Sequence, residues 1–257
     1  MTYQRFAYLY DQLMEDAPYE EWFQFFHKTI QKYQPSTKTV LDVGCGTGAM
    51  LVELVNNGFE PTGIDLSSDM LTIANEKLLQ LGKQVPLFEQ DMRRLDNIGS
   101  FDAIIVFCDS LNYLETEEDI AAAFSSFYRL LNKEGLLLFD VHSTYKIDKV
   151  FIGATFAEEE ENISYIWKSY EGAYRHSVEH DLTFFIKTET GLYERYTELH
   201  KQRTYPVEYY EQHLKENGFQ LLNISANFHL DEPILEKSER IFFVAKKLEG
   251  KSKEVTE

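Results

Sequence analysis

The chain has 257 residues and a formal net charge of −18 at pH 7, with 43 acidic and 25 basic residues. Its length allows a sizeable core in a single domain, and 44% hydrophobic with 26% charged residues is typical of a soluble globular protein. The excess of acid argues against direct binding of naked RNA or DNA, because phosphate contacts require a basic surface.

Hydropathy gives no sign of a membrane segment or an export signal. No apolar run approaches the roughly 20 residues that span a bilayer. Residues 1–20 lack the basic and apolar regions of a signal peptide. The two cysteines, Cys45 and Cys108, show no disulfide framework. We therefore expect a cytoplasmic protein that makes no membrane contact.

Strands and helices are predicted to alternate through the first part of the chain. Helices are expected at 20–33, 49–58, 67–82 and 115–135, and strands at 39–44, 60–66, 85–91, 101–109 and 136–143. The fourth of these strands is apolar almost throughout, as expected of a strand buried on both faces. The alternation predicts an α/β fold with a doubly wound, mostly parallel sheet.

The pattern changes between residues 151 and 205. Aromatic and polar residues alternate there, and the ETG at 189–191 fits a hairpin turn. This segment is predicted to be an antiparallel β subdomain inserted into the α/β domain. A helix at 206–218 and strands at 219–225 and 240–247 follow, which brings the main sheet to seven strands.

The segment VLDVGCGTGAM is predicted to run from a buried strand through a glycine-rich turn into a helix. Gly44, Gly46 and Gly48 expose the backbone at the carboxyl end of a parallel strand, where nucleotide-like ligands bind. A P-loop is excluded, because the spacing G-x-x-x-x-G-K-[ST] is missing. The NAD fingerprint is formally met by Gly44, Gly46 and Ala49 together with an acid at Asp65. On these positions alone, NAD stays an alternative.

Two further acids favour a different ligand. Asp42 places a carboxylate at the mouth of the turn, where it suits an ammonium group better than a pyrophosphate. Asp91 ends the third strand, where it would accept a hydrogen bond from the exocyclic amine of an adenine. A ligand with a cationic end, a ribose and an adenine fits these positions, and S-adenosylmethionine (SAM) is such a ligand.

Four segments in register carry a resemblance to a known family. LDVGCGTG, GIDLSSDML, FEQDMR and LLNKEGLLLFD resemble the motifs of class I SAM-dependent methyltransferases, in matching order and spacing through most of residues 1–145. FAYLYDQLM, VFCDSLNYL and the β insertion are similar to sugar N-methyltransferases of antibiotic pathways, and PYEEWF and FCDSLNYL to glycine N-methyltransferase. The resemblance implies a Rossmann-like fold, SAM as cofactor and methyl transfer to an amine of a small molecule. It weakens beyond residue 150.

The resemblance also assigns cofactor contacts along the strand ends. The three glycines would admit the methionyl part of SAM beside Asp42, and Asp65 would accept hydrogen bonds from both ribose hydroxyls. The other predicted contacts are Leu66, Asp91 and Met92 at the adenine, Phe107 and Cys108 at the methionyl part, and Tyr10 and Trp22 closing over it. Trp22 fits equally well an aromatic that packs a helix on the sheet.

The candidates for a general base lie near the ends of the fourth and fifth strands. An amine acceptor has only to arrive deprotonated, whereas a hydroxyl acceptor needs a base within hydrogen-bond reach. The candidates are Asp109, Tyr113 and His142. His142 also fits a structural role, in which the histidine fixes the end of a strand. HSVEH, with His176 and His180, does not match the metal motif H-E-x-x-H, and no metal is predicted.

We therefore expect an enzyme that methylates a small-molecule acceptor, at nitrogen rather than oxygen. The alternatives are methyl transfer to a protein or ribosomal component, and a SAM-binding regulatory protein without turnover. The expected organisation is a SAM-binding domain of residues 1–150 and 206–250, an inserted antiparallel β lid of residues 151–205, and a disordered tail at 251–257. A homodimer is left open.

Overall fold

The computed structural model of the chain describes residues 17–159, 161–188 and 190–249. The expected tail at 251–257 lies outside these ranges. No helix within them is both long enough and apolar enough to cross a membrane. The elements in chain order are α2 (Tyr19–Tyr33), β1 (Thr39–Val43), α3 (Ala49–Asn56), β2 (Glu60–Asp65), α4 (Ser68–Gln80), β3 (Leu87–Glu89), β4 (Phe101–Val106), η1 (Ser110–Tyr113), α5 (Glu117–Leu130), β5 (Leu131–His142), η2 (Lys146–Phe151), β6 (Thr155–Glu159), β7 (Ile163–Glu171), β8 (Ser177–Lys187), β9 (Tyr193–Arg203), α6 (Val207–Glu216), β10 (Phe219–Ala226) and β11 (Arg240–Lys247).

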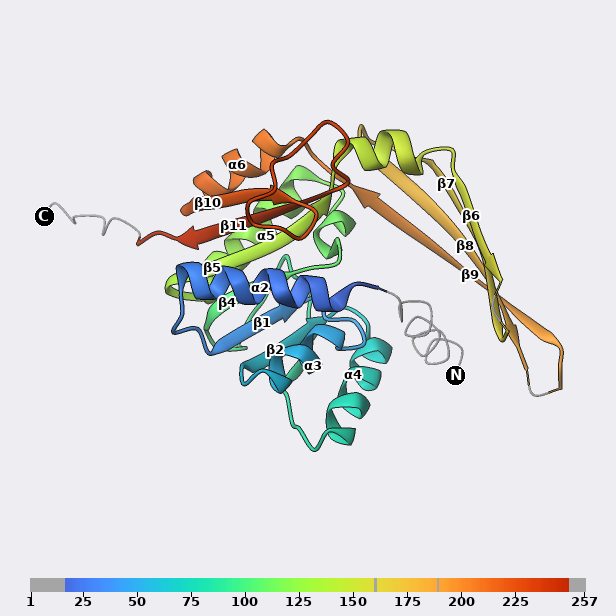
Figure 1. The fold of residues 1–257 in the computed structure, drawn as a ribbon, viewed down its shortest axis with the longest axis horizontal. Helices are drawn as coiled ribbons and strands as arrows, with labels where there is room; N and C mark the ends of the chain where they lie inside the picture. Colours follow the sequence, from blue (N-terminus) through green and yellow to red (C-terminus); the bar gives the residue numbers. More distant parts are fainter. Residues whose placement is uncertain (1–16, 160, 189, 250–257) are drawn as a thin grey trace, which may run out of the picture.

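Seven strands form one sheet in the order β10-β11-β5-β4-β1-β2-β3 (Figure 1). The pairs β1–β2, β1–β4, β2–β3 and β4–β5 are parallel. β11 runs antiparallel to both of its neighbours, β5 and β10. The predicted Rossmann-like, mostly parallel seven-stranded sheet is confirmed.

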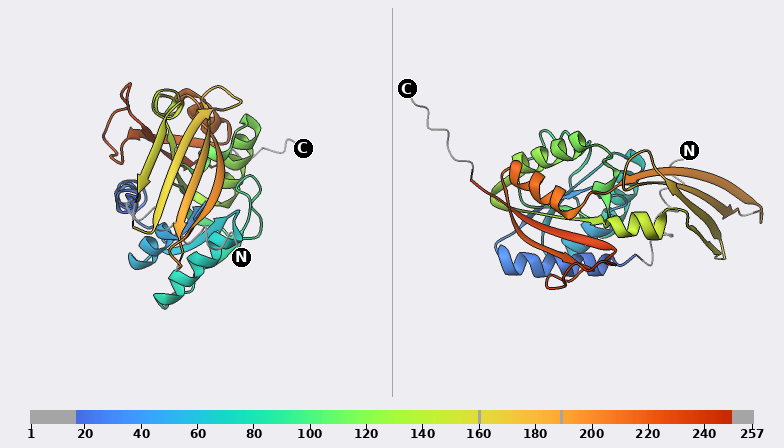
Figure 2. Two further views of the ribbon diagram at one scale, coloured as in Figure 1. Left: turned by 90° about the vertical axis from the view of Figure 1, so that its right-hand side faces the viewer. Right: turned by 90° about the horizontal axis from the view of Figure 1, so that it is seen from above.

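Helices cover both faces of this sheet, because its strands are apolar on both sides. Val40 of β1 belongs to the core cluster that includes Phe25 and Phe26 of α2. Its neighbour Leu41 points the other way, into the cluster that includes Phe124 of α5 and Tyr210 of α6. Figure 2, in the view from above, shows α2 and the pair α5 and α6 on opposite sides of the sheet.

The boundary between α5 and β5 differs from the sequence prediction. The pattern predicts a helix that runs to Gly135, whereas α5 ends at Leu130 and β5 begins at Leu131. Leu131 pairs with Phe101 of β4, and the register then shifts at an irregularity. A Cβ at Gly135 would lie 3.1 Å from the carbonyl oxygen of Asp102. The glycine therefore marks a close approach of two backbones inside a sheet, not the end of a helix.

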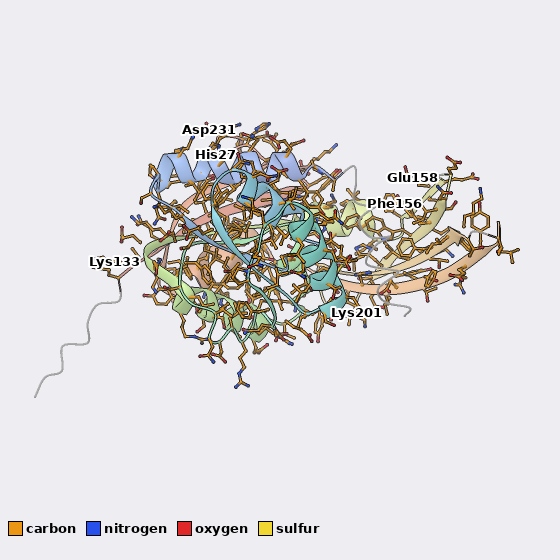
Figure 3. All side chains as sticks on the ribbon, turned by 90° about the horizontal axis from the view of Figure 1, so that it is seen from below. His27, Lys133, Phe156, Glu158, Lys201 and Asp231 are labelled. Carbon is orange, nitrogen blue, oxygen red and sulfur yellow. The ribbon has the colours of Figure 1, made fainter. Side chains whose placement is uncertain are left out.

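The inserted segment forms a separate antiparallel sheet in the order β6-β7-β8-β9. Figure 1 shows it beyond the ends of the parallel strands, and Figure 3 labels two residues of its strand β6, Phe156 and Glu158. The expected hairpin between β8 and β9 is present, with a hydrogen bond from the Gly191 N–H to the Thr188 carbonyl at 2.9 Å. The short helical segment η2, between β5 and this sheet, was not expected. The lid role and the boundaries at 151 and 205 stay predictions.

Buried hydrogen bonds attach this second sheet to the first. Asn112 of η1 is fully buried; its Nδ2 donates to the carbonyl of Arg203 at 2.8 Å, and its Oδ1 accepts from the His142 N–H at 2.9 Å. The hydroxyl of Thr204 donates to the His142 carbonyl at 2.6 Å. Phe151 of η2 packs against the imidazole of His142, with ring centroids 5.2 Å apart. The end of β5 and the end of β9 are thus held beside each other.

We predict that Asn112→Ala lowers the free energy of unfolding by at least about 2 kcal/mol. The change leaves the Arg203 carbonyl and the His142 N–H buried without their partner, and each such group costs about 1–3 kcal/mol. Urea unfolding followed by circular dichroism measures the loss. The control is Asn56→Ala, at an exposed position in α3, which should change the free energy by no more than about 0.5 kcal/mol. Equal values for the two variants would contradict the prediction.

Candidate active site

The turn after β1 is the point where the chain leaves the sheet and enters α3. Gly44 donates through its N–H to the carbonyl of Ile64 at 2.8 Å. Gly44 and Gly48 have φ of 72° and 82°, in the left-handed region that favours glycine. A Cβ at Gly44 would lie 2.7 Å from Ser110 Oγ, whereas a Cβ at Gly46 would meet nothing within 4 Å. The turn is therefore packed on one side and open at Gly46, where a ligand has room to approach the backbone.

Two carboxyl groups flank the open part of the turn. Asp65, at the end of β2, accepts hydrogen bonds from the backbone N–H groups of Gly46 and Ser67, both at 2.9 Å. Asp42 is 3% exposed, and its Oδ2 has no hydrogen-bond partner within the described ranges. Burial, together with the charge of Asp65, raises the pKa of Asp42 to about 8. A buried acid without a partner is unfavourable, so this oxygen is suited to a donor supplied by a ligand.

The ends of β2 and β3 lie side by side, because these two strands pair in parallel. Leu66, directly after Asp65, is 66% exposed and offers an apolar surface. Asp91 follows β3 and accepts from the backbone N–H and the Nε of Arg93, at 2.9 and 3.0 Å. Hydrogen bonding to Arg93 lowers the pKa of Asp91, so that this carboxylate is ionised at neutral pH. Met92 is partly buried against the core.

The turn after β4 carries two predicted cofactor contacts. Phe107 is 3% exposed and its ring meets that of Phe25 edge-on, so its side chain belongs to the core. Cys108 and Asp109 have φ of 54° and 51°, a conformation that costs a non-glycine residue about 1–3 kcal/mol. Burial raises the pKa of the Cys108 thiol. The thiol is therefore protonated and a poor nucleophile.

A buried ion-pair network holds this turn in place. Arg240, the first residue of β11, donates to Asp109 at 2.9 Å and also to Asp140 of β5. Asp140 in addition accepts from the indole N–H of Trp22 at 3.0 Å and from the backbone N–H of Asp109 at 3.2 Å. The Arg240 guanidinium lies 5.0 Å from the Trp22 ring centroid. Trp22 thus packs α2 on the sheet here, and its closure over the cofactor stays a prediction. Tyr10 lies outside the described residues.

The buried network contains two carboxyl groups, of Asp109 and Asp140, and one guanidinium, of Arg240. Burial raises the pKa of Asp109, but its contacts with His142 and Arg240 outweigh burial and hold that pKa well below the usual range. Burial lowers the pKa of His142, although Asp109 acts in the opposite direction. Burial also raises the pKa of Asp140, against the influence of Arg240. Two carboxyl groups therefore face one guanidinium, and the network carries no net positive charge.

The three candidate bases lie at one edge of the sheet, and two residues of β9 join them. His142 Nε2 is 3.3 Å from Asp109 Oδ2, while its Nδ1 is buried and has no partner in the described part of the chain. Gln202 of β9 donates to Asp109 Oδ2 at 2.7 Å. Tyr113 is 48% exposed, and its hydroxyl is 2.9 Å from Nδ1 of His200. Of the three candidates, Tyr113 is the most accessible.

The histidines of HSVEH point to different partners. His176 Nδ1 is 2.7 Å from Asp148 of η2. His180 is buried, and its Nδ1 accepts from the indole N–H of Trp167 at 2.8 Å. Burial lowers the pKa of His180 to about 4, so its imidazole is neutral at pH 7. Over residues 17–159, 161–188 and 190–249, no group of three or more His, Cys, Asp or Glu side chains has an arrangement that could hold a metal ion.

The sequence analysis did not single out four residues that the structure adds to this edge. Asp140 lies inside an apolar run, and Arg240 begins one. A charged residue that is buried needs a partner of opposite charge. The positions of Asp140 and Arg240 in apolar runs therefore indicated that each belongs to a buried ion pair. His200 and Gln202 alternate with other polar residues in a half-exposed strand, which is ordinary for an antiparallel sheet. No local pattern distinguishes those two.

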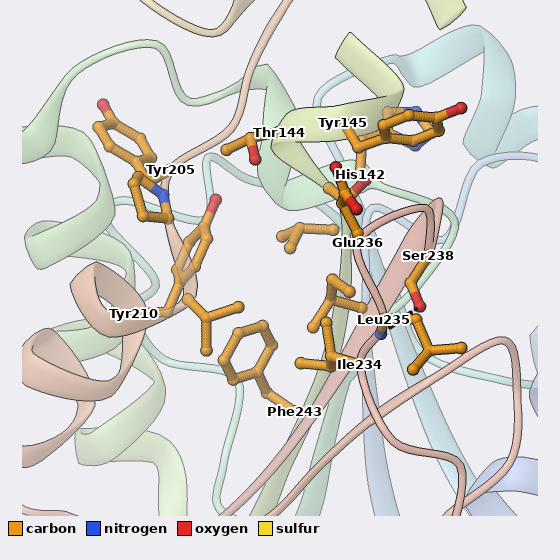
Figure 4. A pocket seen from close by; sticks show the side chains of 15 residues that line it. His142, Thr144, Tyr145, Tyr205, Tyr210, Ile234, Leu235, Glu236, Ser238 and Phe243 are labelled. Carbon is orange, nitrogen blue, oxygen red and sulfur yellow. Dashed lines mark hydrogen bonds between the residues drawn. The ribbon is translucent and has the colours of Figure 1, made fainter. Parts of the chain in front are cut away.

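A separate cavity of about 210 Å³ lies between the end of β5, α6 and the connection from β10 to β11 (Figure 4). Tyr210 and Phe243 line its inner part, and Tyr205, Leu235 and Glu236 lie around it. None of the predicted cofactor contacts lines this cavity. It is therefore distinct from the space beside the glycine turn.

Comparisons with known proteins identify the family of the chain. The family described as "Methyltransferase domain" matches residues 40–135. A predicted methyltransferase of Geobacillus sp. (strain WCH70) is 50% identical over 248 residues, which cover 96% of this chain and 100% of that protein.

Solved structures share the whole fold. The S-adenosylmethionine-dependent methyltransferase from Clostridium acetobutylicum ATCC 824 has a TM-score of 0.87 and 27% identity, over 96% of this chain and 100% of that chain. The sugar N-methyltransferase KedS8 from Streptoalloteichus sp ATCC 53650 has a TM-score of 0.77 and 21% identity, over 94% of this chain and 93% of that one. At that identity, the likeness to KedS8 shows a common fold.

The residues at the glycine turn suit SAM. Gly46 leaves its backbone open, and the unpartnered oxygen of Asp42 is available to a donor such as the ammonium group of SAM. The carboxylate of Asp65, at the neighbouring strand end, suits a ribose. SAM is thus the cofactor, and the chain belongs to the class I SAM-dependent methyltransferases.

Proposed function

We propose that the enzyme transfers the methyl group of SAM to an amine nitrogen of a small molecule. The observation that carries this proposal is the charge at the acceptor edge, where Asp109 and Asp140 face the single guanidinium of Arg240. The proposal places the acceptor between η1, the end of β5 and the inner face of β9. The four-stranded sheet serves as a lid that excludes water from this space.

An amine suits this charge better than a hydroxyl. When bound, SAM supplies a methyl group on a positively charged sulfur, open to in-line displacement. A neutral amine becomes cationic as it takes the methyl group, and the carboxylate of Asp109, which stays ionised, stabilises that charge. A hydroxyl would instead have to lose its proton beside the same carboxylates, which raises its pKa.

The hydrogen bonding of the candidate bases supports the same choice. Asp109 already accepts from Arg240 and Gln202 and lies against His142, so it is a weak base. His142 keeps its free nitrogen buried. In the proposal these two residues hold the site together, while Tyr113, paired with His200, contacts the acceptor. KedS8, a sugar N-methyltransferase of the same fold, adds support for an amine on a small molecule.

The cofactor contacts in this proposal follow the strand ends. Asp42 binds the ammonium group of SAM, and Asp65 binds the ribose hydroxyls. The glycine turn and the backbone of Phe107 and Cys108 accommodate the methionyl part. The adenine lies against Leu66 and Met92, with its exocyclic amine donating to Asp91.

The direct test of the proposal is a methyl-transfer screen with isotopically labelled SAM against panels of small amines and hydroxyl compounds and against cell extract. We expect label in amines, recovered as N-methyl products by mass spectrometry. Label confined to hydroxyl compounds, or to the macromolecular fraction of the extract, would contradict the proposal.

We predict that SAM, or its demethylated product S-adenosylhomocysteine, raises the Tm and that Asp65→Ala removes most of the rise. At a ligand concentration of 100 Kd the stabilisation is about 2.7 kcal/mol, which corresponds to about 5–10 °C for a chain of this size. Differential scanning fluorimetry measures it. The control is Asp181→Ala, at an exposed position of β8, which should respond like the wild type. An equal response to NAD, or a normal response of Asp65→Ala, would show that the cofactor placement is wrong.

We predict that binding of S-adenosylhomocysteine at pH 7 releases close to one proton from Asp42. With a pKa of about 8, this carboxyl is mainly protonated in the free protein, and an ammonium group beside it favours the ionised form. Affinity therefore rises as the pH increases from 6 to 8. Calorimetry in two buffers of different ionisation enthalpy counts the proton, and Asp42→Asn should release none. A wild-type protein that releases no proton would rule out contact between Asp42 and the ammonium group.

We predict that His142→Gln lowers kcat less than tenfold once the pH exceeds the pKa of the acceptor amine. Methylation of a deprotonated amine needs no base, whereas loss of a general base costs about 100-fold or more. Glutamine keeps a donor toward Asp109. The pH dependence of kcat, measured with the acceptor found in the screen, tests this. A loss that no pH restores, with an acceptor shown to be an amine, would mean that His142 is the base.

A further inference from the structure

We propose that Arg240 is a positioning residue that sets the affinity of the enzyme for SAM without contacting it. Arg240 lies on β11, at the far end of the sequence from the glycine turn, and its side chain is 13% exposed. It acts through the turn at residues 107–110. The inference rests on the proposed placement of SAM beside Asp42 and Gly44.

The turn at 107–110 has a conformation that needs support from its surroundings. Cys108 and Asp109 are consecutive non-glycine residues in the left-handed region. Such a conformation persists only where other contacts determine it. The hydroxyl of Ser110 donates to the Phe107 carbonyl at 2.8 Å, which closes the turn but does not fix it to the sheet.

Arg240 supplies that attachment from two directions. It donates directly to the Asp109 carboxylate, and it pairs with Asp140, whose Oδ2 also accepts from the Asp109 N–H. One guanidinium therefore helps to hold both the side chain and the backbone of Asp109, while Gln202 holds the other carboxylate oxygen. Without it, the buried carboxyl groups of Asp109 and Asp140 would lose the donor that they share, which is unfavourable for the turn in this position.

The turn in its fixed position touches the cofactor site. A Cβ at Gly44 would lie 2.7 Å from Ser110 Oγ and 2.9 Å from Ser110 Cβ, so Ser110 lies directly against the glycine turn. Movement of Asp109 carries Ser110 with it and changes the space beside Gly44 and Asp42. The methionyl part of SAM is proposed to lie in that space.

The test compares Arg240→Lys with a matched variant of the neighbouring residue. Lysine keeps the charge, but its single ammonium lacks the planar fork that joins Asp109 and Asp140. We expect the Kd for S-adenosylhomocysteine, measured by calorimetry on the folded protein, to rise at least about tenfold. Glu239→Gln removes the ion pair with Lys146 at 3.2 Å, one residue from Arg240, and should keep the Kd within about twofold.

A merely structural role predicts a different result. Arg240→Lys would then lower the Tm of the free and the ligand-bound protein equally and leave the Kd within about twofold of wild type, which overturns the proposal. An equal rise in Kd for Glu239→Gln also overturns it. If Arg240→Lys does not fold, Arg240→Gln combined with Asp140→Asn removes one charge of each sign, and the same tenfold rise is expected.

Asp65→Ala separates this inference from the proposed cofactor placement. If Asp65→Ala weakens binding and Arg240→Lys does not, the placement stands and the role of Arg240 is wrong. If Asp65→Ala leaves the Kd unchanged, the proposed placement of SAM is wrong. The role of Arg240, which depends on that placement, is then also wrong.

Discussion

The ion pair between Arg240 and Asp109 is the contact on which both sides of the candidate site depend. Its guanidinium also holds Asp140, and the same Asp109 carboxylate receives Gln202 from the second sheet. The ends of β4, β5, β9 and β11 thus meet at one buried group of charges. Removal of one partner from such a group leaves a buried charge unpaired, which costs several kcal/mol. The cofactor turn and the base of the four-stranded sheet are therefore fixed in one arrangement relative to each other.

Two acids at this edge, Asp109 and Asp42, differ in their surroundings. Asp109 has donors on both carboxylate oxygens and a pKa held below its usual range. Asp42 has an oxygen without a partner among residues that the structure describes, and a pKa raised to about 8. Asp42 therefore has an oxygen available to a further donor, whereas both oxygens of Asp109 already accept hydrogen bonds. Sequence position alone gives both the same description, an aspartate near the end of a strand.

The parts of this fold that sequence could predict are those with local physical causes. Strands buried on both faces are apolar throughout, and a glycine-rich turn at the carboxyl end of such a strand marks a ligand site. The error at Gly135 arose because a glycine after a helix usually ends it, whereas here an approach to the Asp102 carbonyl requires it. The contacts of Gln202 and Arg240 with Asp109 join strands far apart in the chain. Their register depends on the assembled sheets, and no local pattern contains it.

The shared carboxylate also connects the turn at residues 107–110 with the second sheet. Arg240 donates to one carboxylate oxygen of Asp109, and Gln202 of β9 donates to the other. A shift of the turn at residues 107–110 therefore also moves the hydrogen-bond acceptor of Gln202. Under the proposed placement, SAM lies on one side of this turn and the acceptor on the other, so both would act on the same carboxylate. If SAM raises the affinity for the acceptor through this contact, linkage requires the acceptor to raise the affinity for SAM by the same factor.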